Sequence, residues 1–519
     1  MSELELTSSI YSFEKLRTGS FLYIDKTEYL WNLLRPSCGM YFLSRPRRFG
    51  KSLTLSTLKA VFEGKKELFK GLALYDKPYS WEKHPVIHLD MNGRRFDTLE
   101  NLERSLREIL KEQALVHKVE LEYEASETMF QKLILRLSEQ GGVVVLLDEY
   151  DKPILENILS PDAQKFMDAL KSFYSVIKGK AELFRFVFVT GVTKFCHVSI
   201  FSDLNNLFDI TMDERYACML GYTQEEFERY FASRIAETEK LLAIPHESFL
   251  AKIKAWYDGY RFAAKAESVY NPVSLAAFFM KGGEFSNFWF STGTPSFLMQ
   301  LVRKTNFDFE AVLNKPISAL AFSAYEVNSL DPLPLLLQTG YLTIRDSFED
   351  FGMTFYNLAF PNIEVRSAFD SYLLNAYTDI NREALSGYAM ELATSVREGK
   401  IEKFMETLKM FFSAIPYDIQ LADEKYYQTV FYILFLLLGV YIEAEARTNR
   451  GRIDAVAACG DWVYIFEFKL NQNAPTALSQ IRDREYYQKY HRAEKRIVLV
   501  GANFDSGKRQ ISDWLSEEL

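Results

Sequence analysis

The residues best suited to chemistry lie in one short stretch, residues 45–52, which reads Arg-Pro-Arg-Arg-Phe-Gly-Lys-Ser. An apolar run at residues 40–43 precedes it, and residues 53–62 follow it with apolar side chains at helical spacing. A strand, a tight loop with Gly-Lys-Ser and a helix form the layout of a phosphate-binding loop. In such a loop the backbone N–H groups and the positive end of the helix hold an anionic phosphate chain.

The side chains of this stretch have expected tasks. We expect Lys51 to reach the terminal phosphates and the Ser52 hydroxyl to complete the shell of a Mg²⁺ ion. The residues predicted to bind the nucleotide here are Arg47, Arg48, Phe49, Gly50, Lys51, Ser52 and Leu53. The motif usually begins with glycine, where this chain has Arg45, and Pro46 lacks a backbone donor. The three arginines of the stretch, Arg45 included, add cations able to fork onto phosphate. The alternative interpretation is a basic turn that caps an ordinary helix.

A second stretch supplies carboxylates. Five apolar residues at 143–147 lead into Asp148, Glu149 and Asp151. This pattern predicts a strand buried on both faces, with acids at the C-terminal edge where open parallel sheets bind ligands. We expect Asp148 to hold Mg²⁺ and Glu149 to orient and deprotonate the attacking water. Because one motif supplies the phosphate cradle and the other the metal ligand and base, together they predict nucleotide binding and, with less support, hydrolysis.

Further elements must position these groups. A strand is predicted at 85–90, helices at 99–115 and 126–139, and a strand at 184–191 that ends in polar residues. In ATPases with an additional central strand, a polar residue at the C-terminal end of the strand that follows the acidic strand, here 184–191, contacts the γ-phosphate. Thr190 is the candidate for this position, and Thr193 is the alternative. The competing interpretation is an ordinary threonine at a strand end without a catalytic task.

The C-terminal part contains a second possible catalytic centre. Asp454 stands about a dozen residues before Glu467 and Lys469, with a tight turn at 459–461 between them. The period of two in a strand places Glu467 and Lys469 on one face, and Asp454 on the paired strand can share a divalent cation with Glu467. The cation would polarise a phosphodiester and acidify bound water, and Lys469 would position that water or stabilise the transition state. The alternative interpretation is that Glu467 and Lys469 are ordinary charged residues on a solvated strand.

The elements around this centre follow the order of a restriction-type nuclease core. The predicted order is helix 426–438, strands 441–447, 452–457 and 462–469, helix 474–490, strand 496–500 and a final helix 510–519. Gln480 on the second helix is a predicted catalytic auxiliary, and Glu424 and Glu445 are further candidates.

Composition limits the class of protein. The 519 residues are 48% hydrophobic and 15% aromatic, which predicts a globular chain of several domains. The net charge of −9 gives no global attraction to nucleic acid, so such a contact needs a local basic surface. Four scattered cysteines, an acidic N-terminus and apolar runs of about a dozen residues predict a cytoplasmic protein without a membrane span.

The middle of the chain, from about residue 211 to 370, is predicted to be helical with short loops. Thr223 and Glu226 have the spacing of a capping box. Residues 338–344 resemble the wing hairpin of a winged-helix unit. Aromatic turns at 256–262 and 288–295 are interpreted as packing anchors rather than sites.

Several motifs resemble one known family. Residues 45–52, the lead-in 23–27 and the segment 147–153 resemble the bacterial AAA-ATPase-like family, as do 338–342 and 360–365. Members carry a C-terminal PD-(D/E)XK nuclease-superfamily domain, which Gly451-Arg452-Ile453-Asp454 and Glu467-Phe468-Lys469 match. The resemblance covers nearly the whole chain, includes the arginine-rich loop, and implies ATP binding and a Mg²⁺-dependent nuclease fold.

The expected protein is therefore an α/β multidomain chain. A P-loop NTPase core of the additional-strand, AAA-like type would span 1–210, a helical and winged-helix-like region 211–370, and a restriction-endonuclease-like αβββαβ domain 371–519. The expected function is an ATPase module, using ATP and Mg²⁺, that controls a nuclease acting on DNA in preference to RNA. The alternative is a nucleotide-switched binding or signalling protein whose nuclease-like domain does not cut. A homo-oligomer is compatible with either.

Overall fold

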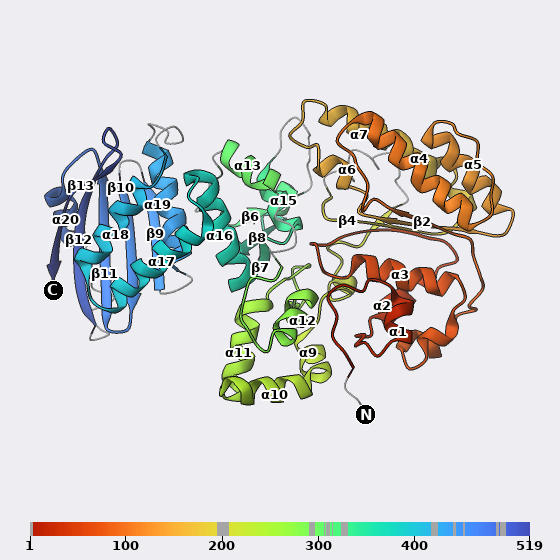
Figure 1. The fold of residues 1–519 in the computed structure, drawn as a ribbon, viewed down its shortest axis with the longest axis horizontal. Coiled ribbons are helices and arrows are strands. Elements are labelled where there is room, and N and C mark those ends of the chain that lie inside the picture. Colours follow the sequence, from red (N-terminus) through yellow and green to blue (C-terminus); the bar gives the residue numbers. More distant parts are fainter. Residues whose placement is uncertain are drawn as a thin grey trace. The chain divides into compact units, whose positions relative to one another are not determined.

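The structure, a computed structural model, divides into two compact units, Met1–Glu364 and Val365–Leu519 (Figure 1). Its described residues are 4–194, 207–289, 296–305, 307, 312–313, 315–322, 331–416, 424–439, 443–449, 452–483, 487 and 495–519. Within them, no helix is both long and apolar enough to cross a membrane.

The first unit is built around a parallel five-stranded sheet with the order β2-β3-β4-β1-β5. Its strands are β1 (Gly39–Ser44), β2 (Val86–Asp90), β3 (Val143–Asp148), β4 (Phe184–Gly191) and β5 (Phe208–Asp209). β1 and β3 are buried along their whole length, as their continuous apolar runs predict. β4 is inserted between β1 and β3, which is the arrangement of an additional-strand ATPase core. All three strands therefore end at one edge of the sheet.

Helices cover both faces of this sheet (Figure 1). One group is α1 (Phe13–Thr18), α2 (Thr27–Leu34) and α3 (Lys51–Phe62), and the other is α4 (Leu99–Val116), α5 (Ser126–Ser138), α6 (Lys152–Leu155) and α7 (Ala163–Gly179). Short 3₁₀ turns are η1 (Lys66–Phe69), η2 (Ala73–Asp76), η3 (Ala181–Leu183) and η4 (Glu214–Tyr216). Because α3 starts directly after the loop that follows β1, its N-terminus lies at the edge where the strands end.

The middle region belongs to the same unit. Its helices are α9 (Gln224–Tyr230), α10 (Ala232–Leu242), α11 (His246–Tyr257), α12 (Pro272–Met280), α13 (Ser296–Lys304) and α15 (Pro332–Gln338). The predicted capping box at the start of α9 is present, since Thr223 and Glu226 bond to each other's backbone N–H. Aromatic side chains such as Phe227, Tyr257 and Phe278 form the core of this region.

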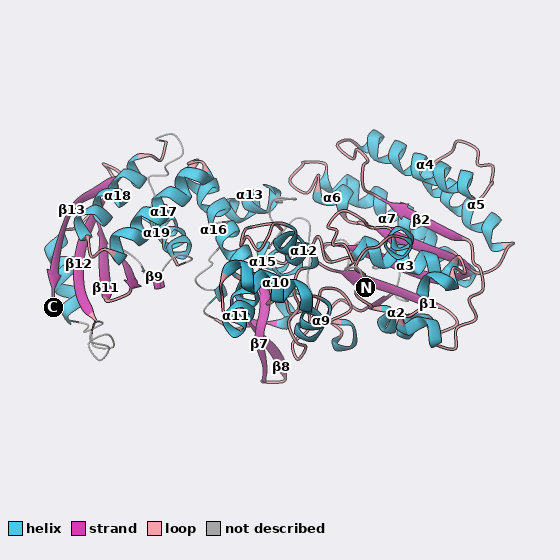
Figure 2. Cartoon of the chain, turned by 60° about the horizontal axis from the view of Figure 1, so that its bottom comes forward, coloured by secondary structure: helices cyan, strands magenta, loops and turns pink. Residues whose placement is uncertain are grey.

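A small antiparallel sheet follows these helices. It has the order β6-β8-β7 and consists of β6 (Ile317–Ser318), β7 (Thr343–Asp350) and β8 (Met353–Ala359), with the 3₁₀ turn η6 (Ala319–Phe322) beside it. Figure 2 shows the β7–β8 hairpin extending from the helices of the middle region. The hairpin fits the winged-helix-like prediction, although residue 338 ends α15 and residues 339–342 form the turn before the wing rather than the wing itself.

The second unit packs helices against a sheet whose strands β11 and β12 are buried along nearly their whole length. The helices are α16 (Ile363–Thr378), which starts in the first unit, α17 (Arg382–Arg397), α18 (Ile401–Ser413) and α19 (Glu424–Leu438). The sheet has the order β13-β12-β11-β10-β9, with α20 (Ala474–Asp483) between β11 and β12 in sequence. Its strands are β9 (Glu443–Asn449), β10 (Arg452–Cys459), β11 (Trp462–Leu470), β12 (Arg496–Asp505) and β13 (Gln510–Glu518). β11 and β12 are parallel, and the other neighbouring pairs of this sheet are antiparallel. Along the chain, α19, β9, β10, β11, α20 and β12 follow the predicted αβββαβ order.

Two sequence predictions for this unit need correction. The final helix predicted at 510–519 is wrong, because β13 occupies Gln510–Glu518 and pairs antiparallel with β12. Ile511, Trp514 and Leu515 do have helical spacing, but the free edge of the ten-residue strand β12 offers backbone partners that outweigh local preference. The helix predicted at 474–490 ends at Asp483, and most of 484–490 lies outside the described residues.

Candidate functional site

The loop between β1 and α3 is built to receive an anion. Gly50, with φ of 96°, is the residue before α3, and no side chain caps this helix. Arg48 is also left-handed, with φ of 67°. Among the described residues, the amides of residues 48–53 find no backbone acceptor, so several donors at a positive helix end stay available. The residues present therefore fit a bound phosphate chain.

Lys51 is buried within this loop. Its ammonium donates to the carbonyls of Arg45, at 2.9 Å, and Pro46, at 3.0 Å. A lysine ammonium has three donors, so one remains for a phosphate oxygen. Burial lowers the pKa of Lys51, while the nearby carboxylates of Glu149 and Asp148 act in the opposite direction. The loop lysine and the acidic end of β3 therefore form one electrostatic site. The Ser52 and Leu53 side chains are half-buried in the first turn of α3.

Asp148 and Thr190 meet at the ends of neighbouring strands. The Thr190 hydroxyl donates to Asp148 Oδ1 at 2.7 Å, and both side chains are buried. This contact depends on β4 lying beside β3, and it orients the carboxylate while leaving its other oxygen for a cation. Thr193, the alternative candidate, instead donates to Asp151 Oδ2 at 2.8 Å. Asp151 also accepts the N–H groups of Val192 and Thr193, so this pair ties the strand ends together.

Glu149 has the backbone of a strained residue. Its φ is 51°, an unusual value for a residue with a Cβ, and such strain is concentrated at functional sites. The side chain is half-buried, and in the part of the chain that the structure describes its carboxylate has no hydrogen-bond partner. Burial raises its pKa, which Lys51 partly counteracts. A raised pKa and a free carboxylate suit a general base.

The position of the Arg45 side chain contradicts the expectation that its guanidinium binds phosphate. Its side chain is 1% exposed, and its guanidinium donates to the carbonyls of Ser44, Thr211 and Tyr216. The guanidinium also lies 4.2 Å from the centre of the Phe262 ring. The expectation that it faces phosphate is therefore wrong, because its donors hold the main chain beneath the loop. Arg47 is exposed, and Arg48 bonds to the Tyr11 hydroxyl.

Sequence reasoning missed an aromatic support under the loop. Phe49 is buried edge-on against Tyr260 at 4.8 Å and Phe262 at 5.2 Å between ring centres. The indole Nε1 of Trp289 donates to the Arg47 carbonyl at 3.0 Å. These three aromatic residues were predicted only as general packing anchors. Their position in the chain, more than 200 residues from the loop, carries no indication of this contact.

The second unit brings the other predicted catalytic residues together. Asp454 and Glu467 are direct partners in the β10–β11 register. Lys469 lies on the same strand face, with its Nζ 3.0 Å from Glu467 Oε1, and it donates to the Gln480 amide oxygen on α20. Glu467 is fully buried. The side chains of Asp454, Glu424 and Glu445 lie outside the described residues, and no cluster of three potential metal ligands occurs within those described.

The sheet separates this centre from the helical core. Phe466 and Phe468 face the opposite side and pack on Phe404 of α18 and Phe431 of α19. α20 lies on the side of Glu467, very close to β12. A Cβ on Gly501 would meet the Leu478 nitrogen at 2.5 Å, and Gly501 is the register partner of Glu467. Glycine is therefore required for the approach that brings Gln480 to Lys469.

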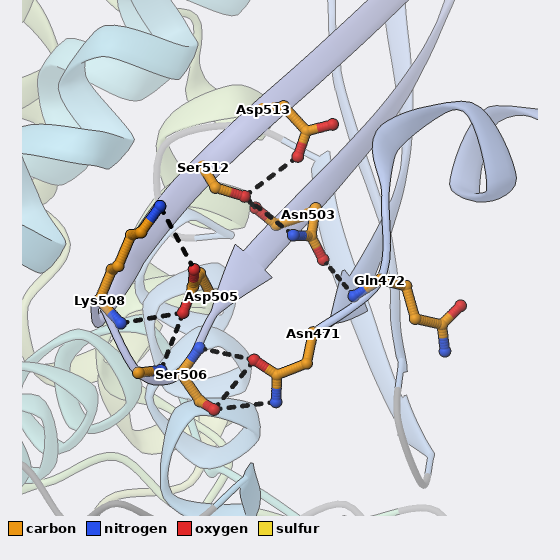
Figure 3. A network of polar contacts seen from close by, with 9 residues as sticks. Asn471, Gln472, Asn503, Asp505, Ser506, Lys508, Ser512 and Asp513 are labelled. Carbon is orange, nitrogen blue, oxygen red and sulfur yellow. Dashed lines mark hydrogen bonds and ion pairs between the residues drawn. The ribbon is translucent and has the colours of Figure 1, made fainter.

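A polar network fixes the connection from β11 to α20 (Figure 3). Asn471 accepts from the Ser506 backbone N–H at 2.9 Å, and the Gln472 N–H donates to Asn503 Oδ1 at 2.8 Å. Asp513 Oδ2 of β13 accepts from the Ala474 N–H at the start of α20. These contacts fix residues 471–474, which connect the strand of Lys469 to the helix of Gln480.

Comparison with known proteins finds family matches for an N-terminal and a C-terminal part of the chain. Residues 8–201 match the AAA-ATPase-like family, described as "Predicted AAA-ATPase", and residues 422–514 match the PD-(D/E)XK nuclease superfamily. Over 538 residues the chain is 36% identical to an "Uncharacterized protein in vnfD 5'region" of Azotobacter chroococcum mcd 1, with 100% of each covered. The chain belongs to the AAA-ATPase-like family with a C-terminal PD-(D/E)XK domain. No solved structure matches it. The resemblance drawn from the motifs is thereby confirmed.

In this AAA-ATPase-like chain, two middle-region segments that carry the resemblance, 338–342 and 360–365, connect to the phosphate loop, directly or through residues 258–260. A Cβ on Gly340 would lie 2.7 Å from Pro46 Cγ, so residues 338–342 touch the loop directly. The Asn362 amide donates to the Asp258 carbonyl, and a Cβ on Gly259 would meet the Pro361 carbonyl oxygen at 1.9 Å. The family motifs of the middle region therefore support the loop rather than form a separate site.

Proposed function

We propose that the AAA-ATPase-like unit binds and hydrolyses ATP and controls a Mg²⁺-dependent nuclease in the C-terminal unit. The observation that carries the ATPase part is the Thr190–Asp148 contact of 2.7 Å, at the sheet edge that also holds Lys51 and Glu149. These side chains supply a phosphate cation, a metal ligand with its orienting hydroxyl, and a base. A basic turn that only caps a helix would need none of the carboxylates.

The residues have separate tasks in this proposal. Lys51 and the loop amides bind the phosphates, and Ser52 and Asp148 would hold Mg²⁺, which would neutralise charge on the phosphates when bound. Thr190 fixes the orientation of Asp148. Glu149 accepts the proton of the attacking water. Hydrolysis of a phosphoanhydride then depends mainly on positioning and charge neutralisation.

In the nuclease part, Asp454 and Glu467 would hold Mg²⁺, which when bound would polarise the scissile phosphodiester. Lys469 positions the attacking water or stabilises the developing charge, and Gln480 orients Lys469 through their hydrogen bond. The proposed substrate is nucleic acid, with DNA favoured over RNA, and the proposed location is the cytoplasm. The discriminating experiment incubates the protein with plasmid, single-stranded DNA and RNA in Mg²⁺ or Mn²⁺, with and without ATP.

A second candidate function is a nucleotide-switched protein that binds nucleic acid without cutting it. The burial of Glu467 and its ion pair with Lys469 favour this candidate, because a metal ion and water must reach that carboxylate for cleavage. Wild-type protein that binds nucleic acid but never cuts it, with variants of Glu467 that bind equally well, would establish this function.

Replacing Lys51 tests the phosphate loop. Ligand at about 100 times its Kd stabilises a folded protein by about 2.7 kcal/mol. We expect Lys51→Ala to abolish the thermal stabilisation that ATP gives the wild type, because a buried cation facing phosphate is lost. Lys59→Ala, on the outer side of the same helix and paired with Glu63, is the matched control and should keep the full shift. A normal ATP shift in Lys51→Ala would remove the lysine from the site.

The pKa of Glu149 predicts a pH dependence. Only the carboxylate can act as base, and burial raises its pKa above the ordinary value of 4.5. The acid limb of kcat/KM for ATP hydrolysis should therefore lie at a higher pH than that of an ordinary glutamate, with activity lost as the pH falls through it. A pH profile of kcat/KM measures this. A limb at the ordinary glutamate value would show that another group, or an unburied Glu149, controls the rate.

A further inference from the structure

Trp289 bridges the phosphate loop and the first residues of α16. Its indole N–H donates to the Arg47 carbonyl at 3.0 Å, and its backbone N–H donates to Glu364 Oε1 at 2.8 Å. Trp289 is 7% exposed and Glu364 is fully buried. The bond to Glu364 is therefore shielded from water, where such contacts are stronger than at a surface, while the bond to the Arg47 carbonyl is part-buried.

The indole has little freedom to turn. Its ring lies edge-on to Tyr341 at 5.4 Å and to Tyr260 at 6.3 Å between centres. Glu364 is itself held by the Ser274 hydroxyl at 2.8 Å, in the first turn of α12. The donor that reaches the loop is therefore fixed by two aromatic rings and a buried carboxylate.

The bond to Arg47 determines how the loop presents its amides. The C=O and N–H of a trans peptide point in opposite directions, so a carbonyl held toward Trp289 holds the Arg48 N–H away from it. Arg48 has a φ of 67°, a conformation that a residue with a Cβ keeps only with support from its surroundings, while Gly50 adopts its φ of 96° without strain. The Arg48 amide has no backbone acceptor among the described residues, so it stays available for an anion.

We propose that Trp289 is a positioning residue of the ATP site, whose indole N–H keeps the Arg47–Arg48 peptide in the orientation that offers the loop amides to the phosphates. Glu364 in turn positions Trp289. The inference rests on the proposed function, since it requires that this loop binds ATP. It adds a residue from the middle region that does not touch the nucleotide.

The test removes only the indole N–H. Trp289→Phe keeps an aromatic ring, and 3-benzothienylalanine at position 289 keeps the bicyclic shape and places sulfur where the N–H was. Loss of one hydrogen bond of this kind corresponds to a loss of roughly 2- to 10-fold in ATP affinity. We expect this loss for ATP and for inorganic tripolyphosphate alike, with a raised KM and a kcat within about 2-fold of wild type, because the contact acts on phosphate binding. Trp256→Phe, in the aromatic core away from the loop, is the control and should leave ATP affinity unchanged.

The outcomes separate the two levels of the proposal. Wild-type affinity for ATP in the folded benzothienyl variant would overturn the positioning role and leave the proposed function intact. Failure of the wild type to bind ATP would overturn both. A loss of affinity for ATP without a loss for tripolyphosphate would also contradict the inference, since the bond would then not act through the phosphates. Should Trp289→Phe not fold, the benzothienyl variant alone decides.

Discussion

Glu149→Gln is expected to bind ATP normally and to hydrolyse it roughly 10²-fold more slowly than wild type, or slower still. The amide keeps the shape and the strained backbone at φ of 51°, but it cannot accept the proton of the attacking water. Lys51 and Asp148 remain in place, so phosphate and metal binding should survive. Steady-state ATP hydrolysis and a separate ATP-binding titration measure the two effects.

The control for this variant is Glu156→Gln. Glu156 follows α6, a short distance along the same segment, and burial raises the pKa of its carboxyl as well. It lies outside the proposed site, so its amide variant should hydrolyse ATP at the wild-type rate. Turnover by Glu149→Gln at the wild-type rate would exclude Glu149 as the base, and equal losses in both variants would point to a general effect of charge.

Asp454→Ala and Glu467→Ala are expected to abolish metal-dependent cleavage of nucleic acid while ATP binding stays unchanged. The two acids are direct register partners, and the proposed cation would neutralise the repulsion between their carboxylates. Lys469→Ala should keep the metal and lose most of the rate. Asp461→Ala, at the exposed turn of the same hairpin, is the control and should cut normally. Gel assays of plasmid cleavage, with metal binding measured in parallel, separate the three cases.

Control of the nuclease by ATP makes a further demand. Lys51→Ala should alter the cleavage rate although the residue belongs to the other unit, because a ligand shifts only those equilibria whose states it binds differently. Identical cleavage rates for wild type without nucleotide, wild type with ATP and Lys51→Ala would instead describe two independent enzymes on one chain.

The sequence alone determined the local elements that carry the chemistry. The run before the loop, the Gly-Lys-Ser turn and the helix after it predicted β1 and α3, because strand burial and helix start depend on neighbouring residues. The same reasoning predicted β3 with its terminal acids, and it predicted β10 and β11 with Asp454 opposite Glu467, since a tight turn sets the register of a hairpin.

The tertiary structure decided which distant groups meet. Thr190 reaches Asp148 only because β4 inserts between β1 and β3. The order of strands in a sheet cannot be predicted from the hydrophobic period of each strand. The Arg45 side chain is held beneath the loop because the carbonyls of Thr211 and Tyr216, more than 160 residues along the chain, accept from its guanidinium and the Phe262 ring lies beside it. β13 is a strand because the edge of β12 was free to pair, against a helical pattern in its own residues. The partners of Thr190 and Arg45 are remote in sequence, and the partner of β13 is the preceding strand; each of these contacts exists only once the chain has folded.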